Sequence, residues 1–312
     1  MAMMKAVRMH EYGSIDGLVY EEVAKPQPAT DEVLIQVKSA GVNPVDWKMV
    51  EGFGQGWMGH LMPHILGVDV AGVVEAVGSR VTKFKAGDAV YGYATFSREG
   101  SFAEYVAVKA SDIAAKPATL DFVQAAAVPV AAMTSWQGIL AQGKLSAGQK
   151  ILIHAAAGGV GLMAVQLAKA QGAVVIGTAS ARNLEFVKAW GADEVIDYTS
   201  VKFEDAVSDV DVVFDLIGGD TQARSLKVLK KGGILVSAVA PPDEQAAEAQ
   251  GVRAVMVGVQ PDGAQLEALT ELIDAGKVKV FVEQVFPLAE AKAALRLNKQ
   301  GRTRGKIVLS VE

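Results

Sequence analysis

Cysteine is absent from this sequence of 312 residues. The chain therefore forms no disulfide bonds and offers no thiolate ligands to a metal, and it is compatible with a reducing compartment. The sequence also lacks any run approaching the roughly 20 apolar residues of a membrane-spanning helix. Its first 22 residues contain no apolar core of signal-peptide length. Together these absences predict a cytoplasmic protein that is not inserted in a membrane.

Clusters of basic residues are missing too. Lys and Arg number 30 against 35 Asp and Glu, which gives a formal net charge of −5. Without a positive patch, nucleic acids and anionic membranes are not expected partners. The chain is long, however: 312 residues, 51% of them hydrophobic and 21% charged, are ordinary for a globular enzyme and favour two domains.

The first 120 residues have the pattern of short strands. Val-rich segments alternate apolar and polar residues, and glycines separate them. This pattern predicts a compact, mostly antiparallel β domain, a barrel or a sandwich. The expected strands cover residues 4–9, 18–23, 32–42, 69–78, 88–94 and 101–108.

From about residue 121 the pattern changes to alternating helices and strands. An Ala-rich helical stretch at 124–140 precedes a buried strand at 150–155. Such alternation predicts βαβ units and a doubly wound parallel sheet. Further strands are expected at 173–179, 194–198, 211–217, 232–238 and 253–259, with helices near 162–171, 183–190 and 221–229.

The last fifty residues do not continue this alternation. A helix is expected near 265–275, a strand at 279–286, a helix from Leu288 and a final strand at 306–311. We therefore assign the tail back to the first domain. The predicted domains are a β domain of residues 1–124 and 260–312, and a nucleotide-binding domain of residues 125–259.

The segment "IHAAAGGVG", residues 153–161, has the form of a phosphate-binding turn. Its A-x-G-x-x-G spacing places a small residue at the turn and a glycine where a backbone must approach a pyrophosphate. The last glycine stands where helix and strand pack closely. A strand before the turn and a helix after it favour dinucleotide binding, although a purely structural turn is the alternative. The predicted contacts are Ala156, Gly158, Gly159, Val160 and Gly161.

The end of the second strand of this domain indicates which dinucleotide is bound. NAD sites usually place a carboxylate here for the ribose 2′-OH. In this chain, residues 177–184 contain no acidic residue, and the next one is Glu185. Ser180 and Arg182 are present instead, and a guanidinium suits a 2′-phosphate because its planar fork donates twice. The sequence therefore favours NADPH. In the alternative, Ser180 caps the next helix and Arg182 is a solvated surface residue.

Several further motifs follow one another along nearly the whole chain: "AGVNPVDWK" (40–48), "LGVDVAGVVEAVG" (66–78), "GDAVYG" (87–92), "GSFAEYVAV" (100–108) and "RGKIVLSV" (304–311). Together with the glycine turn they resemble the medium-chain dehydrogenase/reductase superfamily. More narrowly, the chain is similar to its zinc-independent quinone oxidoreductase and enone reductase branch. The resemblance implies an N-terminal GroES-like β domain, a Rossmann domain and a C-terminal segment that returns to the first domain.

The resemblance also implies further cofactor contacts. Thr134, in "AAMTSW", is similar to the family threonine beside the nicotinamide ribose, with helix packing as the alternative. Tyr198, at the end of the strand expected at 194–198, is also expected to contact the cofactor. In this family the front domain closes over the nicotinamide and builds the substrate cleft.

Zinc ligands are missing at the family positions. Zinc-dependent alcohol dehydrogenases carry Cys where this chain has Asn43, and a His-Glu pair where it has Val68-Asp69. His60 and His64 are four residues apart, but Pro63 argues against the helix that would present both to one metal. We expect that pair to lie in a surface loop, and we expect no metal.

Without a metal to polarise an alcohol, the acceptor must already be electron-poor. A quinone, or the β-carbon of an α,β-unsaturated carbonyl compound, fits hydride transfer from NADPH. The predicted catalytic residues are Asn43 as an amide donor, Asp46 as a residue that orients a neighbour, and Lys48 as a cation near the enolate oxygen. Many quinone reductases carry Tyr at the position of Lys48. The alternatives are a turn at Asn43-Pro44 and a solvated Lys48.

A different class of function stays open. The chain could be an NADPH-binding redox sensor, or a structural crystallin-like relative with little turnover. In either case the family resemblance implies a homodimer joined through the apolar segment at 253–259, since exposed strand edges of this kind are normally covered.

Overall fold

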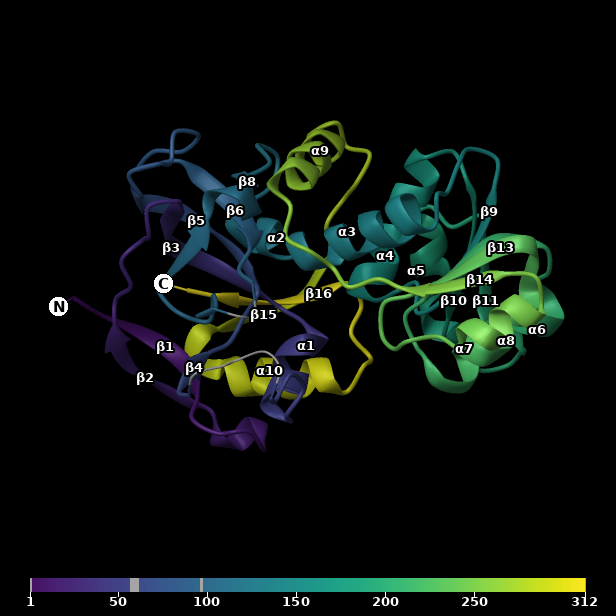
Figure 1. Ribbon diagram of the computed structural model, residues 1–312, viewed down its shortest axis with the longest axis horizontal. Helices are drawn as coiled ribbons and strands as arrows, with labels where there is room; N and C mark the ends of the chain where they lie inside the picture. Colours follow the sequence, from purple (N-terminus) through teal and green to yellow (C-terminus); the bar gives the residue numbers. More distant parts are fainter. Residues whose placement is uncertain (1, 57–61, 96–97, 312) are drawn as a thin grey trace. The chain divides into compact units, whose positions relative to one another are not determined.

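The structure is a computed structural model that describes residues 2–56, 62–95 and 98–311 (Figure 1). It divides into two compact units. Unit 1 contains Met1–Val130, Pro261–Gly276 and Val280–Glu312, and unit 2 contains Ala131–Gln260 and Lys277–Lys279. The C-terminal segment therefore returns to the first unit, as the sequence predicted.

Unit 1 is built on a seven-stranded sheet in the order β15-β16-β3-β5-β6-β8, with β7 pairing β3. All its pairs are antiparallel except β15 with β16. A second sheet has the order β2-β1-β4. The strands are β1 (Met3–Met9), β2 (Val19–Ala24), β3 (Glu32–Val42), β4 (His64–Ile65), β5 (Asp69–Val77), β6 (Ala89–Tyr93), β7 (Tyr105–Lys109), β8 (Ile113–Ala115), β15 (Val282–Pro287) and β16 (Lys306–Ser310).

Among its described residues, unit 1 has the α-helices α1 (Pro44–Val50), α2 (Phe122–Ala126), α9 (Gly263–Asp274) and α10 (Ala291–Lys299). The first of them differs from the sequence expectation, which placed no helix at 44–50. Asn43 adopts the extended conformation of a helix N-cap, Pro44 occupies the first helical position, and Asp46 accepts the Asn43 N–H. Trp47 then anchors the helix on α10, because its indole N–H donates to Asn298 Oδ1 at 3.1 Å.

The core of unit 1 packs α1 and α10 against the inward faces of the strands. Ile35 from β3, Phe102 from the segment before β7 and Leu309 from β16 are fully buried. Leu295 closes the core from α10. Burial of such side chains contributes about 1.5–3 kcal/mol each, which fixes the ends of β3, β5 and β16 relative to one another.

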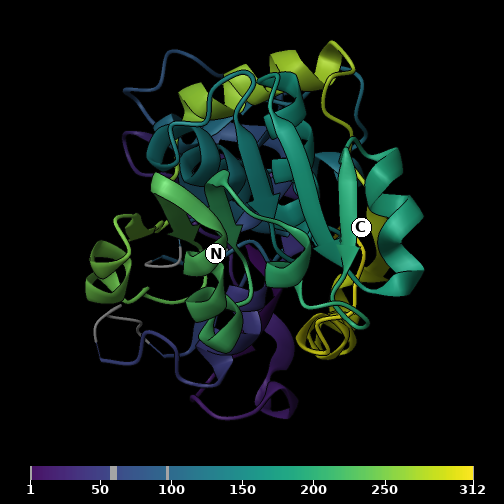
Figure 2. The same cartoon turned by 90° about the vertical axis from the view of Figure 1, so that its right-hand side faces the viewer.

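Unit 2 contains a six-stranded parallel sheet in the order β11-β10-β9-β12-β13-β14 (Figure 2). The chain starts in the middle, winds to one edge and then to the other, which is the doubly wound order of dinucleotide-binding folds. Its strands are β9 (Lys150–Ile153), β10 (Val174–Ala179), β11 (Glu194–Asp197), β12 (Val210–Asp215), β13 (Leu229–Ser237) and β14 (Arg253–Met256).

Helices connect these strands, as the alternation in the sequence predicted. The α-helices are α3 (Pro129–Ser135), which begins at the end of unit 1, α4 (Gly159–Ala170), α5 (Leu184–Ala189), α6 (Phe203–Ala206), α7 (Gly219–Ser225) and α8 (Glu244–Ala249), and a π-helical segment spans Trp136–Gln142. The strand β14 lies at one edge of the sheet and pairs with β13, and its Met256 side chain is 46% exposed.

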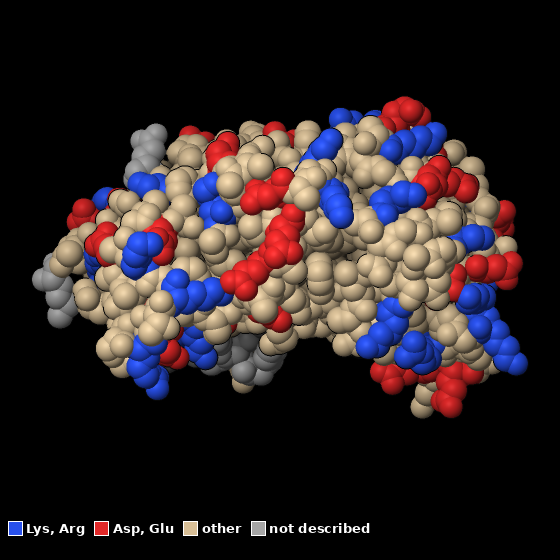
Figure 3. All heavy atoms as spheres, turned by 90° about the horizontal axis from the view of Figure 1, so that it is seen from above, with Lys and Arg blue, Asp and Glu red and all other residues tan. Residues whose placement is uncertain are grey.

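Surface charge is mixed in sign. On the face shown in Figure 3, basic and acidic side chains alternate over both units without a continuous basic patch. Within the described residues, no helix combines the length and apolar character needed to cross a membrane.

Candidate functional site

The predicted nucleotide turn lies between β9 and α4. The Ala156 N–H donates to Thr178 O at 3.0 Å, and the Gly158 N–H donates to Ala155 O at 3.0 Å. Ala155 has φ = 49°, a left-handed conformation that costs a residue with a side chain. A Cβ on Gly161 would lie 2.3 Å from Ala155 O. Only glycine at position 161 therefore lets the helix start against this turn.

The same turn fits a pyrophosphate. The helix α4 has 12 residues, and its N-cap is Gly158, which brings no side chain. A Cβ on Gly158 would meet only Ala155 O, at 3.4 Å, so the space in front of its backbone is open. The first N–H groups of a helix have no partner within the helix, and the helix dipole favours an anion there. Gly159, Val160 and Gly161 supply those N–H groups.

Three further predicted cofactor residues follow the ends of neighbouring strands. Ser180 comes after β10, and its Oγ accepts a long contact of 3.4 Å from Asn183 Nδ2. Arg182 is exposed in the short 3₁₀ turn Ala181–Asn183. Tyr198 follows β11, is 60% exposed, and its N–H donates to Ala179 O at 3.2 Å. Because β10 and β11 are parallel, these residues all lie at the carboxyl ends of the strands.

One carboxylate at this edge was not predicted. Asp197 is the partner of Ala179 across the β10–β11 pair. Its Oδ1 accepts the Thr199 hydroxyl at 2.6 Å and the Thr199 N–H at 3.0 Å. The hydrogen bonds from Thr199 lower the pKa of Asp197, so that the group is ionised at neutral pH. Asp197 bonds to Thr199 in the turn that follows β11. It therefore does not occupy the position directly after β10, where NAD sites usually have their carboxylate.

Thr134 lies in α3 and is 7% exposed. Its neighbour Ser135 donates its hydroxyl to Ala131 O and to Val160 O, both at 2.8 Å. The Val160 contact ties the end of α3 to the first turn of α4, within unit 2. Thr134 is thereby carried on a helix that is fastened to the nucleotide turn.

A buried histidine braces the same strands. His154 is 1% exposed, with Thr178 Oγ1 3.1 Å from its Nδ1 and Ser225 Oγ 2.9 Å from its Nε2. Burial lowers the pKa of His154 to about 4, so the ring is neutral at physiological pH. Sequence analysis did not single out this residue. His154 directly follows β9, at the start of the glycine turn, and its ring contacts β10 and α7.

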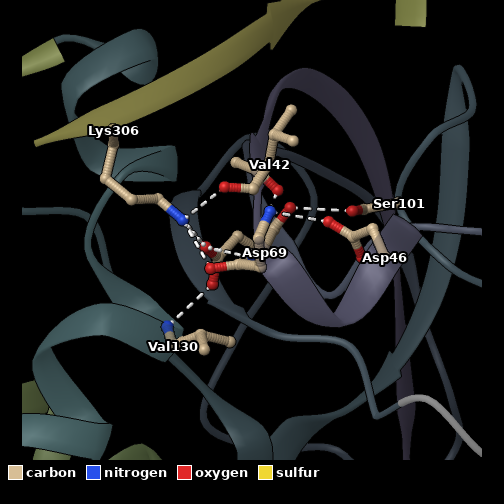
Figure 4. Close-up of polar contacts among 8 residues, drawn as sticks. Val42, Asp46, Asp69, Ser101, Val130 and Lys306 are labelled. Atoms are coloured by element: carbon tan, nitrogen blue, oxygen red, sulfur yellow. Dashed lines mark hydrogen bonds and ion pairs between the residues drawn. The ribbon is translucent and has the colours of Figure 1, made fainter. Parts of the chain in front are cut away.

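In unit 1, the predicted residue Asn43 belongs to a buried polar cluster with Asp69 and Lys306, both of which are labelled in Figure 4. Asn43 Nδ2 donates to Asp69 Oδ2 at 2.9 Å, and Lys306 Nζ donates to Asn43 Oδ1 at 2.5 Å. Lys306 Nζ also donates to Asp69 Oδ2 at 3.1 Å and to Val42 O at 2.9 Å. The Val130 N–H donates to Asp69 Oδ1 at 2.7 Å. The two members of one ion pair thus hold the Asn43 amide: Asp69 accepts from its Nδ2, and Lys306 donates to its Oδ1.

Sequence analysis did not assign Asp69 and Lys306 a role. Asp69 was noted only as a departure from a His-Glu pair, and Lys306 only as part of a closing strand motif. The pairing of Ile307 with Val42 places Lys306 beside Asn43. Lys306 and Asp69 are 237 residues apart, so no local pattern could connect them.

The other two predicted catalytic residues lie on α1. Asp46 is fully buried, and its Oδ2 accepts the Asn43 N–H at 2.7 Å. Its Oδ1 has no hydrogen-bond partner among the described residues. Burial raises the pKa of Asp46 to about 7. Lys48 is half-buried, and its ammonium lies 5.7 Å from the centre of the Trp47 ring; in the described part of the chain it has no ion pair.

The histidine pair was assigned in part wrongly. His64 is 4% exposed in β4, where it pairs with Met9, so it is not in a surface loop. The reason is that β4 adds to the sheet of β1 and buries its two residues. His60 lies outside the described residues. Among the residues that are described, no three His, Asp or Glu side chains are grouped so as to hold a metal ion.

Comparison with known proteins gives two family matches. Residues 29–118 match the alcohol dehydrogenase GroES-like domain, and residues 190–309 match the zinc-binding dehydrogenase family. The second matched segment contains neither cysteine nor histidine. These matches define the class as a two-domain dehydrogenase or reductase.

Relatives narrow this class. The chain is 40% identical to the NADPH-dependent alkenal/one oxidoreductase, chloroplastic, of Arabidopsis thaliana, over 98% of this chain and 79% of that protein. It is 36% identical to the quinone oxidoreductase of Coxiella burnetii, with a TM-score of 0.94 and full coverage of both chains. The Escherichia coli quinone oxidoreductase complexed with NADPH is 30% identical, with a TM-score of 0.89, over 99% of this chain and 100% of that one.

The chain therefore belongs to the medium-chain dehydrogenase/reductase family, in its quinone oxidoreductase and enone reductase branch. This confirms the resemblance drawn from the motifs, and it confirms the predicted fold of a GroES-like domain with a Rossmann sheet.

Proposed function

We propose that this protein reduces quinones or α,β-unsaturated carbonyl compounds by hydride transfer from NADPH, without a metal. One observation carries the proposal. The glycine turn leaves open space at the start of α4, and it occurs in a chain with Asn43 and Val68 at positions where the zinc enzymes carry ligands. The relatives named as alkenal/one and quinone oxidoreductases support the same acceptors.

The residues present fit NADPH, which when bound supplies a hydride from its nicotinamide ring. The N–H groups of Gly159, Val160 and Gly161 bind the pyrophosphate at the open start of α4. Ser180 and Arg182 bind the 2′-phosphate, for which a guanidinium fork is well suited. Ala156 and Gly158 shape the turn, and Thr134 and Tyr198 complete the proposed cofactor contacts.

At the acceptor, the residues of α1 stabilise the negative charge that develops on oxygen. Lys48 is the group best suited to this, because in the described part of the chain no carboxylate neutralises its ammonium. Asn43 has one amide hydrogen bonded to Asp69, and its other contact, to Gly41 O, is long at 3.4 Å. That second N–H is the one that donates to an acceptor oxygen, while the amide keeps the orientation set by Asp69 and Lys306. Asp46 fixes the start of the helix that carries Lys48.

The experiment is an acceptor panel of quinones, enones and saturated alcohols, run with NADPH or NADP⁺. We expect quinones and enones to be reduced and alcohols to stay inert. Lys48→Ala should lower kcat and kcat/KM together for enones, by roughly one to two orders of magnitude, and less for quinones, which need less stabilisation. Lys109→Ala is the matched control, since Lys109 is an exposed lysine of β7 in the same unit.

Two outcomes would contradict the proposal. Saturable NADPH binding without oxidation by any acceptor would favour a redox sensor or a structural crystallin-like protein. Equal effects of Lys48→Ala and Lys109→Ala would make Lys48 an ordinary surface lysine, and would leave Asn43 as the group that assists the acceptor.

Further parts of the proposal concern organisation. We propose an acceptor-binding domain of residues 1–124 and 260–312, and an NADP(H)-binding domain of residues 125–259. We also propose a homodimer joined edge to edge at β14, and a cytoplasmic location. The short, partly apolar edge of β14 supports the dimer, and cell fractionation of the tagged protein tests the location.

A further inference from the structure

The buried cluster in unit 1 contains more acids than bases. Asp46 and Asp69 are fully buried, and Lys306 is 5% exposed. If all three groups were ionised, the interior would hold one uncompensated negative charge. An unpaired charge in a protein interior costs several kcal/mol, and a group usually avoids this cost by changing its protonation state. A neutral cluster therefore requires that one of the two carboxyl groups keep its proton.

The hydrogen bonds decide which carboxyl this is. Asp69 accepts from three donors, namely Lys306 Nζ, Asn43 Nδ2 and the Val130 N–H. Donors of this kind favour the ionised form. Asp46 accepts only the Asn43 N–H, and its Oδ1 has no partner in the described parts of the chain. Asp69 is accordingly the carboxylate, and Asp46 is the acid.

Among the described residues, the elements packed against α1 direct no second cation at Asp46: α10 packs on α1 and carries Arg296 and Lys299, but these pair with Asp16 and Glu51. Asp69 lies on β5, Lys306 on β16, and Tyr93, the cross-strand neighbour of Asp69, on β6. Burial raises the pKa of Tyr93, and the nearby carboxylate of Asp69 raises it further, so the phenol is neutral. In the described part of the chain, Lys306 thus remains the one cation that acts on the two carboxyl groups.

We propose that Asp46 is a neutral carboxylic acid in the folded protein and acts as a positioning residue. While Asp46 keeps its proton, Lys306 is left to Asp69 (Figure 4) and to Asn43, whose amide is held in one orientation by its hydrogen bonds. Loss of the proton would set two carboxylates in competition for one ammonium at the start of α1. The consequence for activity rests on the proposed function, because it concerns the residues 43–48 assigned there.

The direction of the pH effect follows from the two states. Burial raises the pKa of Asp46 from 3.8 to about 7, opposed by the Asn43 N–H and Lys306. Below about pH 4 both the folded and the unfolded chain are protonated, so Asp46 makes no difference. As the pH rises towards 7 only the unfolded chain loses the proton, and stability falls. Above about pH 7 the loss of stability is complete. It amounts to a factor of about a thousand in the folding equilibrium constant, or about 4 kcal/mol.

The test uses Asp46→Asn, which has the shape of the neutral acid but does not ionise. Urea unfolding of the wild type and the variant is compared from about pH 5 to about pH 8. Relative to the wild type, the variant should gain about a hundredfold in folding equilibrium constant over this range. Asp112→Asn is the matched control, a buried aspartate of the same unit that bonds Ser111, and it should gain much less. A difference between Asp46→Asn and wild type that does not change with pH would overturn the proposal.

A second measurement does not depend on the variant folding. Carbon-13 NMR of aspartate carboxyl groups in the wild-type protein reads protonation directly, and one buried carboxyl should titrate near neutral pH. If every buried aspartate is ionised at pH 6, the proposal is wrong. Neither readout needs turnover, so a protein that shows the protonated Asp46 but reduces no acceptor would refute the proposed function alone. With an active acceptor, kcat of the wild type should fall above about pH 7, and this fall should be absent in Asp46→Asn.

Discussion

The closest packing in the proposed cofactor site is at Gly161, and it allows a sharp test. A Cβ there would lie 2.3 Å from Ala155 O and 2.8 Å from Ala156 Cα. Both are backbone atoms of the turn, so no side chain can rotate to relieve the contact. To reach even 3.0 Å the Ala155 carbonyl must retreat by about 0.7 Å, from a residue already at φ = 49°.

Gly161→Ala should therefore affect both stability and cofactor binding. Overpacking of this kind costs about 1–3 kcal/mol, which urea unfolding measures as a lower midpoint. The shift of the turn also misdirects the N–H groups of α4. Since a hydrogen bond to a charged group contributes roughly 1.5–3 kcal/mol, Kd for NADPH should rise by about tenfold or more in a fluorescence titration.

Two further glycine variants separate the contributions. A Cβ on Gly158 meets only Ala155 O at 3.4 Å, so Gly158→Ala should fold normally but bind NADPH weakly, because its methyl group occupies the approach of the pyrophosphate. Gly258→Ala is the matched control in unit 2, since no described atom lies within 4 Å of its Cβ. Wild-type stability of Gly161→Ala would refute the packing argument, and wild-type NADPH affinity of Gly158→Ala would reduce the turn to a structural role.

Three other predictions concern the cofactor, the metal and the assembly. Arg182→Ala should weaken NADPH binding by about one to two orders of magnitude and leave NADH nearly unchanged; equal losses in calorimetry would indicate a structural role for Arg182. Activity should survive dialysis against a strong chelator, whereas stoichiometric zinc that restores lost activity would overturn the argument from Asn43 and Val68. Met256→Glu should convert the proposed dimer to a monomer, because it places a charge on the β14 edge; a wild-type monomer at micromolar concentration in light scattering would disprove the dimer.

The features that the sequence predicted well are local in the chain. The strand expected at 32–42 is β3, with the same bounds, because a long run of alternating apolar residues specifies it. The glycine turn is likewise local, and each βαβ unit of unit 2 spans only about thirty residues of sequence. Short elements that depend on packing were missed. The helix α1 has only seven residues, too few for a helical period, and it exists because Asn43 and Asp46 cap it and Trp47 bonds to α10.

The candidate site divides in the same way. Residues named from the turn and from the end of β10 lie at the carboxyl edge of the sheet, and their roles stay predictions. Asn43 and Asp46 were named for their own chemistry, but their environment is set by Asp69 and Lys306. That environment arises from the register of β16 on β3. Register between strands this distant is decided by the whole core, which a motif does not report.

The position of Lys306 in the last strand also affects how the chain can fold during synthesis. Asp69 and Lys306 are separated by 237 residues, so at about 5–20 residues per second the ribosome delivers the cation roughly 10–50 s after the carboxylate. Most of unit 2 is one continuous segment, Ala131–Gln260, which leaves the ribosome earlier. The nascent unit 1 must meanwhile keep Asp69 hydrated or bound to another partner. A chain interrupted before position 306 would lack both the cation that neutralises Asp69 and the strand β16 that completes the sheet of unit 1.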